Sequence, residues 1–210
     1  MHDYQPYSTI GFHSCDKEVG LRVLNGADDL LPSKNPWDWL GGGIYFWEQN
    51  PLRALEYATE CAQRKQFNKI PIKMPFVIGA IIDLGNCLNL VESSSLKVLS
   101  TSYRVLEKLA EETGQKMPVN NNNNRALDCL VIKFVHKLNS LFHEQPYDTV
   151  RCAFPEGTEV YPTSHISSRL HIQVCVRNTA CIKGFFLPRP LDKFNPSFQS
   201  DKFTSPLKRA

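Results

Sequence analysis

The sequence has 210 residues, of which 42% are hydrophobic and 21% are charged, and its formal net charge is +3 at pH 7. These values are typical of one globular domain with a real core, and the mild positive charge permits contact with nucleic acid without arguing for it. No apolar run approaches the roughly 20 residues of a membrane-spanning helix, and the N-terminus lacks the pattern of a secretory signal. The cysteines, seven in number and scattered, favour reduced thiols in the cytoplasm over a disulfide framework.

The first forty residues predict a strand, a short helix and a loop. Residues 8–15 alternate as a strand does, and Asp16 can cap the helix that follows. The loop at 27–40 contains Trp37 and Trp39, which we interpret as core residues.

A glycine triplet at 41–43 runs directly into an aromatic strand at 44–47, with the sequence Ile-Tyr-Phe-Trp. Glycine has no Cβ, so the backbone there can press against a flat ligand or adopt a positive φ. Alternation along the strand puts Tyr45 and Trp47 on one face and the two other residues on the opposite face.

The next element is a helix expected over 51–66, with Asn50 just before it as a cap. This helix carries Tyr57. Two tyrosines delivered by a strand and the following helix, Tyr45 and Tyr57, can form an aromatic slot for a planar ring. The alternative interpretation is that the aromatic residues are core and the glycines form a turn.

The rest of the chain predicts a strand buried on both sides, two helices that form an insertion, three late strands and a tail. We expect the buried strand at 76–84, the helices at 93–112 and from the Asn-rich run 120–124 to about 142, and the late strands at 147–154, 169–177 and 181–187. The tail from Pro188 on is rich in proline and lysine and contains three phenylalanines. We expect it to be irregular and to lie along a surface of this domain or of a partner.

The order of these features resembles the nicotinamide pocket of ADP-ribosyltransferases of the diphtheria-toxin and poly(ADP-ribose)-polymerase type. Members of that family have a histidine on an early strand, then a Gly-Ile-Tyr-Phe-like strand, then a second tyrosine on the next helix. Here His13 lies about thirty residues before Tyr45, a separation like the family's. The resemblance implies an α+β fold with an ADP-ribosyltransferase-like split β-sheet core, flanking helices and a helical insertion at about 90–145.

By this resemblance, His13 bonds the ribose on the nicotinamide side of NAD, and Tyr45 and Tyr57 sandwich the nicotinamide ring. Backbone groups of Ser14, at a position where the family usually has glycine, bond the carboxamide, and Gly43 completes the cofactor-binding set. From the residues themselves, Arg151 on the first late strand can clamp the pyrophosphate with two hydrogen bonds. Its alternative role is an arginine at a strand edge, paired with an acidic neighbour.

Most members of the family also place a catalytic glutamate on a late strand, where its charge stabilises the cation that forms as nicotinamide leaves. Gln173 stands at that position here. Three accounts are open: Gln173 acts through neutral polarity, a carboxylate of the loop Pro155–Glu159 reaches in, or the domain binds NAD without turning it over. The family recognises its acceptor at this loop, which favours Glu156; the alternative is a solvated turn carboxylate.

Together these features favour an NAD-dependent mono-ADP-ribosyltransferase whose catalytic residues are His13, Tyr45, Gln173 and Glu156. Residues 1–187 form the expected domain and 188–210 a Pro-rich basic tail. NAD is the expected co-substrate, no metal is expected, and the macromolecular acceptor is nucleic acid slightly more than protein. By analogy, an intracellular toxin or phage-defence effector in the cytoplasm, with a neutralising antitoxin protein as partner, fits these features. The rival functions are an RNA 2′-phosphotransferase-like enzyme and a catalytically silent domain that binds a partner.

Overall fold

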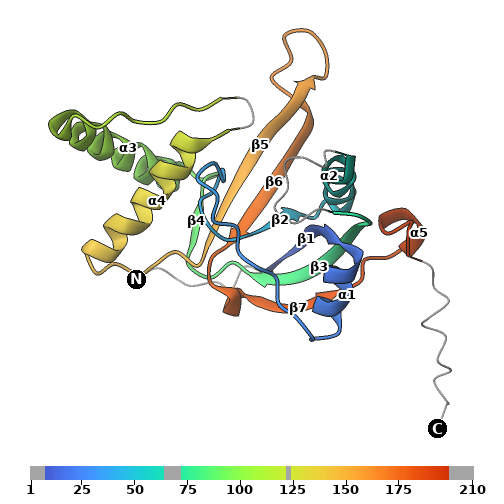
Figure 1. The fold of residues 1–210 in the computed structure, drawn as a ribbon. Coiled ribbons are helices and arrows are strands. Elements are labelled where there is room, and N and C mark those ends of the chain that lie inside the picture. The colour runs from blue at the N-terminus through green and yellow to red at the C-terminus, as the bar shows by residue number, and fades with distance from the viewer. Residues whose placement is uncertain (1–7, 64–71, 122–123, 199–210) are drawn as a thin grey trace.

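The computed structural model describes residues 8–63, 72–121 and 124–198, and it has an α+β fold with one seven-stranded mixed sheet (Figure 1). The strands are β1 (Ser8–Asp16), β2 (Ile44–Glu48), β3 (Pro75–Asp83), β4 (Cys87–Asn89), β5 (Thr149–Glu159), β6 (Ser167–Val176) and β7 (Ile182–Phe186). The helices are α1 (Lys17–Leu24), α2 (Pro51–Gln63), α3 (Ser93–Thr113), α4 (Ala126–Leu141) and α5 (Leu191–Phe194).

The sheet is weakly joined at its centre. Its strand order is β4-β5-β6-β2-β1-β3-β7, and only β4 and β5 run parallel. Strand β1 pairs with β3 along its whole length but with β2 only at Gly11–Glu48 and Phe12–Trp47. Beyond Phe12 the two strands diverge, and we name this divergence the split. In Figure 1, β5 and β6 rise steeply, whereas β3 and β7 run across the lower part of the molecule.

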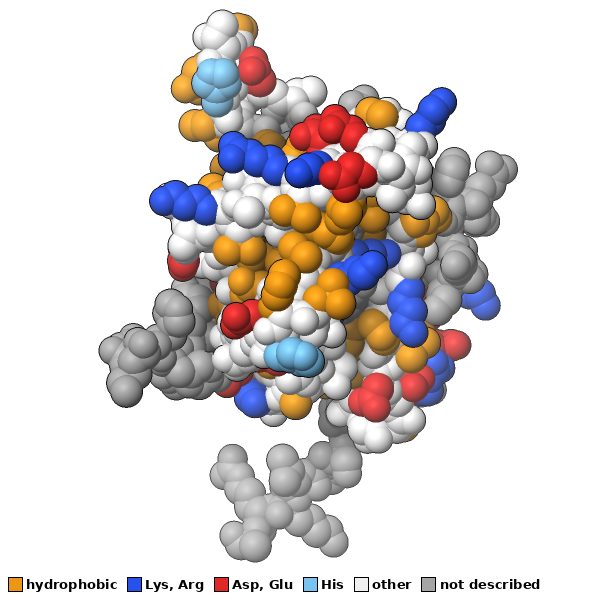
Figure 2. Space-filling view, turned by 90° about the vertical axis from the view of Figure 1, so that its left-hand side faces the viewer, with side chains coloured by type: hydrophobic (Ala, Val, Ile, Leu, Met, Phe, Trp, Pro, Cys, Tyr) orange, Lys and Arg blue, Asp and Glu red, His pale blue; other side chains and the backbone are white. Residues whose placement is uncertain are grey.

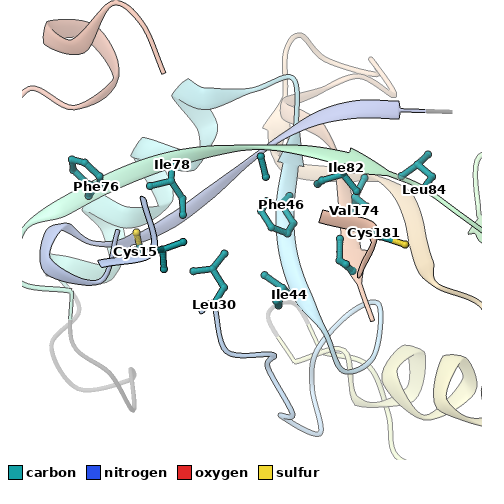
Figure 3. Packing of buried hydrophobic residues seen from close by; sticks show 13 residues of the cluster. Cys15, Leu30, Ile44, Phe46, Phe76, Ile78, Ile82, Leu84, Val174 and Cys181 are labelled. Carbon is teal, nitrogen blue, oxygen red and sulfur yellow. The ribbon is translucent and has the colours of Figure 1, made fainter. Parts of the chain in front are cut away.

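The alternation predicted for the aromatic strand is confirmed. Ile44 and Phe46 of β2 enter a core cluster with β3, β6 and α1, and Figure 3 shows both side chains facing Leu30. Tyr45 and Trp47 point to the opposite face, where Tyr45 packs beneath α4 and Trp47 beneath α2. We name this second side of the sheet the helical face, because α2 and α4 pack on it.

Most of the predicted elements are present, with the predicted caps. The Asp16 side chain accepts a hydrogen bond from Glu18 N at 3.0 Å, and the Asn50 side chain accepts one from Arg53 N at 3.0 Å. The side chain of Asn120 accepts from the first turn of α4. These side chains satisfy amide groups that the first helical turn leaves without partners.

Three predictions about elements need correction. Strand β4 was not expected, because three residues carry no recognisable period. Strand β5 continues through the stretch at 155–159 that we expected to be a loop, since Gly157 adopts a φ of +86° beside a register shift and the hairpin continues past it. Trp37 is exposed rather than core, whereas Trp39 does pack, with its ring centroid 4.4 Å from that of Phe154.

The part of the tail that the structure describes, up to residue 198, packs on this domain. Asn195 is fully buried, and its side-chain amide bonds both Val77 N, at 2.7 Å, and Val77 O, at 3.0 Å. The Phe198 ring lies 6.0 Å from that of Phe76. The surface expected for the tail is therefore the domain's own up to this point, and Phe203 lies outside the described residues.

The insertion consists of α3 and α4. Helix α4 packs on the helical face of the sheet through Ile132 and Val135. Helix α3 packs largely on α4 and leaves part of its apolar side exposed, including Leu96, Val105 and Leu109. Figure 2 views the molecule from the side of this insertion and shows hydrophobic side chains gathered there. Among the described residues, no helix is long and apolar enough to span a membrane.

Candidate functional site

His13 bridges the split. Its Nδ1 lies 2.8 Å from the backbone oxygen of Tyr45. A carbonyl oxygen only accepts, so Nδ1 carries the proton. Burial lowers the pKa of His13, which keeps the ring neutral and leaves a lone pair on Nε2. No described residue bonds that nitrogen, so it can accept a hydrogen bond from a ligand hydroxyl.

The backbone of Ser14 also faces the split. Gln49 N donates to Ile10 O at 2.9 Å, so the peptide groups of Ile10 point toward β2. Backbone direction alternates along a strand, and therefore the N–H and C=O of Ser14 point the same way. Strand β2 has already diverged there. One donor and one acceptor thus face the split side by side, while the Ser14 hydroxyl bonds Ala54 O of α2.

Tyr45 supports the glycine loop. Its hydroxyl accepts from Leu40 N at 2.9 Å and donates to Gly41 O at 2.7 Å. Burial raises the pKa of this phenol, so the hydroxyl stays protonated and can keep donating. Gly41 needs glycine for its φ of +78°, and Gly43 needs it because a Cβ would lie 2.5 Å from Cys175 Sγ. The triplet is thus explained by a turn and by close packing against β6.

Tyr57 lies at the other side of this region, with 42% of its surface exposed. The ring of Tyr57 neighbours that of Trp47, with the two centroids 5.0 Å apart. Tyr45 instead packs in the cluster beneath α4. Sequence reasoning did not single out Trp47 as a site residue, although strand alternation had already put it on the face of Tyr45. Its Nε1 is buried without a hydrogen-bond partner.

Gln173 lies on the helical face of β6, in register with Trp47. Because Trp47 pairs in turn with Phe12, Gln173 lies about 10 Å, two strand spacings, from β1. Its side-chain nitrogen is 2.9 Å from Nε2 of His171. His171 is 5% exposed and lies near the rings of Trp47 and Phe154, with centroids 6.4 and 5.9 Å away. Strand alternation along β6 puts His171 on the same face as Gln173.

Glu156 is a strand residue, contrary to the expected loop position. It lies on β5 in register with Arg169, and its Oε2 is 2.6 Å from Nη2 of Arg53. The Arg53 side chain is only 5% exposed and has two further carboxylates, Glu56 and Glu60, at 3.7 and 3.8 Å. The carboxylate expected to meet the acceptor is thus held by a buried cation from α2.

A cavity of about 390 Å³ opens beside this ion pair. It lies between the first turns of α2 and the start of β6, and its lining is Asn50, Leu52, Arg53, Glu56, Ser168, Arg169 and Leu170. Nε and Nη1 of Arg53 are buried without hydrogen-bond partners. Another cavity, of about 670 Å³, lies along the tail from Arg189 to Phe198, away from the residues that carry the chemistry.

Arg151 is engaged by acidic and amide groups. Its Nη2 and Nε lie 2.7 and 2.8 Å from Oε2 of Glu48, and its Nη1 donates to Asn89 at 3.2 Å. Thr9 donates to the other oxygen of Glu48 at 2.9 Å. The acidic pairing matches the alternative considered from the sequence, but the expected edge position is wrong, because β5 lies between β4 and β6. Arg151 must leave Glu48 to clamp a pyrophosphate. Within the part of the chain that the structure describes, no cluster of side chains could hold a metal ion.

The chain is similar to an archaeal protein over most of its length. The chain is 24% identical over 205 residues to uncharacterized protein MJ0359 of Methanocaldococcus jannaschii, and the match covers 87% of this chain and 90% of that protein. No protein-family model matches the chain, and no solved structure matches it significantly. A function is therefore inferred from the geometry of the split and of the residues around it.

Proposed function

We propose that this protein is an NAD-dependent mono-ADP-ribosyltransferase with an ADP-ribosyltransferase-like split sheet. The observation that carries the proposal is the split itself. Ser14 faces it with a backbone donor and a backbone acceptor, and the ring of His13 reaches across it to Tyr45 O, lies near Phe46 and has a lone pair on Nε2. A carboxamide requires one acceptor and one donor at close spacing, and a ribose hydroxyl requires an acceptor. Nicotinamide riboside, as part of NAD, carries both groups.

The reaction transfers ADP-ribose from nicotinamide to an acceptor. The glycosidic bond breaks with its electron pair leaving on nicotinamide, the acceptor's nucleophilic atom forms a bond to the same ribose carbon, and the acceptor releases its proton. Neutral His13 accepts a hydrogen bond from a ribose hydroxyl and fixes the sugar. Gln173 stabilises the cationic sugar through its amide dipole, which is weaker than a carboxylate charge, and we expect a slow enzyme.

For the acceptor we propose nucleic acid. The cavity beside α2 is lined by two guanidinium groups, the carboxylate of Glu56 and the exposed side chains of Leu52 and Leu170. A nucleobase has donors, acceptors and apolar faces in the same small volume, so such a mixed lining suits it. Glu156 does not line this cavity but is held by Arg53, which does, through their ion pair. An enzyme of this kind fits a cytoplasmic toxin or phage-defence effector that a partner protein neutralises.

The test is incubation of the purified protein with NAD labelled in its adenylate part, together with whole-cell lysate. We expect label on a macromolecule, loss of that label after nuclease but not protease digestion, and release of nicotinamide. Label removed by protease alone would retain the transferase and overturn the nucleic-acid acceptor. Absence of NAD binding by calorimetry would overturn the proposed function and leave a partner-binding domain.

A further inference from the structure

We infer that His171 is a positioning residue that orients the amide of Gln173, so that the carbonyl oxygen of Gln173, and not its nitrogen, faces the ribose. The inference rests on the proposed function for its ligand, but its structural part concerns protons within the protein alone. It explains how a glutamine can replace a carboxylate, since an amide has one electronegative end and must be turned the right way.

The first step identifies which ring nitrogen of His171 carries the proton. Nδ1 of His171 lies 2.7 Å from the backbone oxygen of Arg169, which only accepts. Nδ1 therefore carries a hydrogen. A neutral imidazole has a single N–H, so Nε2 is left with a lone pair and accepts.

The second step identifies which end of the Gln173 amide faces His171. The group 2.9 Å from Nε2 of His171 must donate, which identifies it as the side-chain NH₂. This follows from the chemistry of Arg169 O and does not depend on how the two ends of the amide are assigned. The oxygen of Gln173 then points away from His171, and no described residue donates to it. A partial negative charge is left for a ligand on the helical face.

The third step is what holds His171 neutral. Its imidazole lies near the rings of Trp47 and Phe154, and burial lowers its pKa. Two charges face it from neighbouring elements: Glu156 of β5 raises the pKa and Arg53 of α2 lowers it. These two groups oppose each other and pair at 2.6 Å, and the hydrogen bond to Arg169 O also raises the pKa, but burial is the largest effect and the pKa is lowered.

Protonation of His171 reverses the arrangement. Both ring nitrogens then donate, so Gln173 must turn its oxygen toward His171 and present NH₂ to the ribose. The positive end of the amide would then face the developing cation, which opposes nicotinamide departure. The turnover rate kcat for NAD hydrolysis should fall as the pH drops through the lowered pKa of His171, while the KM for NAD changes little.

The experiment compares His171→Phe with His136→Phe. His136 is a second partly buried histidine, on α4, whose two ring nitrogens have no hydrogen-bond partner, and it serves as the matched control. We expect His171→Phe to lower kcat for NAD hydrolysis by about tenfold to a hundredfold and to remove the acid limb of its pH profile. His136→Phe should keep both. Equal activity and equal pH profiles in the two variants would overturn the inference.

A measurement without NAD separates this inference from the proposed function. In protein carrying ¹⁵N-labelled histidine, NMR reports which nitrogen of His171 is protonated. We expect the neutral Nδ1–H form at pH 7 in the wild-type chain. A protonated Nε2 at pH 7 would overturn the orientation of Gln173 even if the enzyme is active. If His171→Phe does not fold, this measurement on the wild-type chain decides the matter. A protein with the expected tautomer that does not bind NAD would leave the orientation intact and refute the proposed function.

Discussion

The split and the region between α2 and β6 each contain a histidine that is neutral and protonated at Nδ1, but the two histidines have different roles. At the split, His13 donates from Nδ1 to a backbone oxygen, and none of the described residues bonds its Nε2. Beneath α2, His171 also donates from Nδ1 to a backbone oxygen, but its Nε2 is taken by Gln173. One lone pair is available to a ligand directly, and the other acts through a neighbouring amide. Burial fixes the protonation state, and the neighbouring side chain decides what it is used for.

The largest expected effect comes from the directly acting histidine. We expect His13→Ala to lower nicotinamide release by about a hundredfold or more, because it removes the acceptor that fixes the ribose. The sharper variant is His13→Asn, whose side-chain NH₂ can keep the bond to Tyr45 O while its oxygen, bonded to Cγ, does not reach the position of the histidine Nε2. Both variants should fold, as circular dichroism would report. Normal release of nicotinamide by folded His13→Asn would remove the lone pair from the mechanism.

His171, which acts through Gln173, should become dispensable when Gln173 is replaced. A carboxylate is negative at both oxygens and needs no orientation, so we expect Gln173→Glu to raise NAD hydrolysis by about tenfold or more. Adding His171→Phe should then cost much less than it does in the wild-type chain. A double-mutant cycle of hydrolysis rates measures this coupling. Equal costs of His171→Phe in both backgrounds would show that it acts on folding or on another group.

Substitution of Tyr57 should affect NAD binding, whereas substitution of Tyr45 should affect the stability of the fold. Tyr57 is partly exposed, so Tyr57→Ala should raise the Kd for NAD by about tenfold and leave thermal stability nearly unchanged. Tyr45→Phe leaves Leu40 N without its acceptor, so we expect a loss of about 1–3 kcal/mol of unfolding free energy. Calorimetry with NAD and chemical denaturation distinguish the two outcomes. A large stability loss in Tyr57→Ala with an unchanged Kd would contradict this division.

The smallest effect concerns His136, which neither bonds the ribose, as proposed for His13, nor orients an amide, as inferred for His171. Burial lowers its pKa from the ordinary 6.5 to about 4, so the unfolded chain binds a proton there that the folded chain does not. Stability is therefore complete above pH 6.5 and is lost as the pH falls toward 4. We expect His136→Phe to flatten this loss in denaturation curves taken across that range, without changing NAD hydrolysis at neutral pH. Parallel curves for the two proteins would mean that other groups dominate acid unfolding.

How much the sequence predicts differs between the two regions. Near the split, local patterns are sufficient: strand alternation puts Tyr45 beside Trp47, and the residue types at Asp16 and Asn50 predict the helix caps. Beneath α2, the contacts join residues more than a hundred positions apart, as in the pair Arg53–Glu156. No periodicity reports such a pairing, because it depends on how α2 crosses the sheet.

Turn chemistry explains the misjudged position of Glu156. The residues around it, Pro155 and Gly157, are typical of a turn, and a turn was therefore expected there. In the structure the hairpin of β5 and β6 continues past them, with Gly157 supplying the positive φ at a register shift. A long antiparallel partner thus overrode the local preference, and the residue moved from a loop to a strand beside Arg169.

The buried amide of Asn195 has a consequence for how the protein behaves at high concentration. Strand β7 stops pairing with β3 at Gly79, so the outer edge of β3 from residue 75 to 78 lacks a strand. Asn195 meets Val77 with one donor and one acceptor, as a peptide unit of another strand would. Together with the Ser197 hydroxyl, which donates to Pro75 O at 3.2 Å, this side chain closes an edge that is otherwise a template for intermolecular strand addition. A chain shortened before Asn195 would expose the backbone N–H and C=O groups of this β3 edge, so its self-association should increase. Every residue of the split and of the His171 region would still be present.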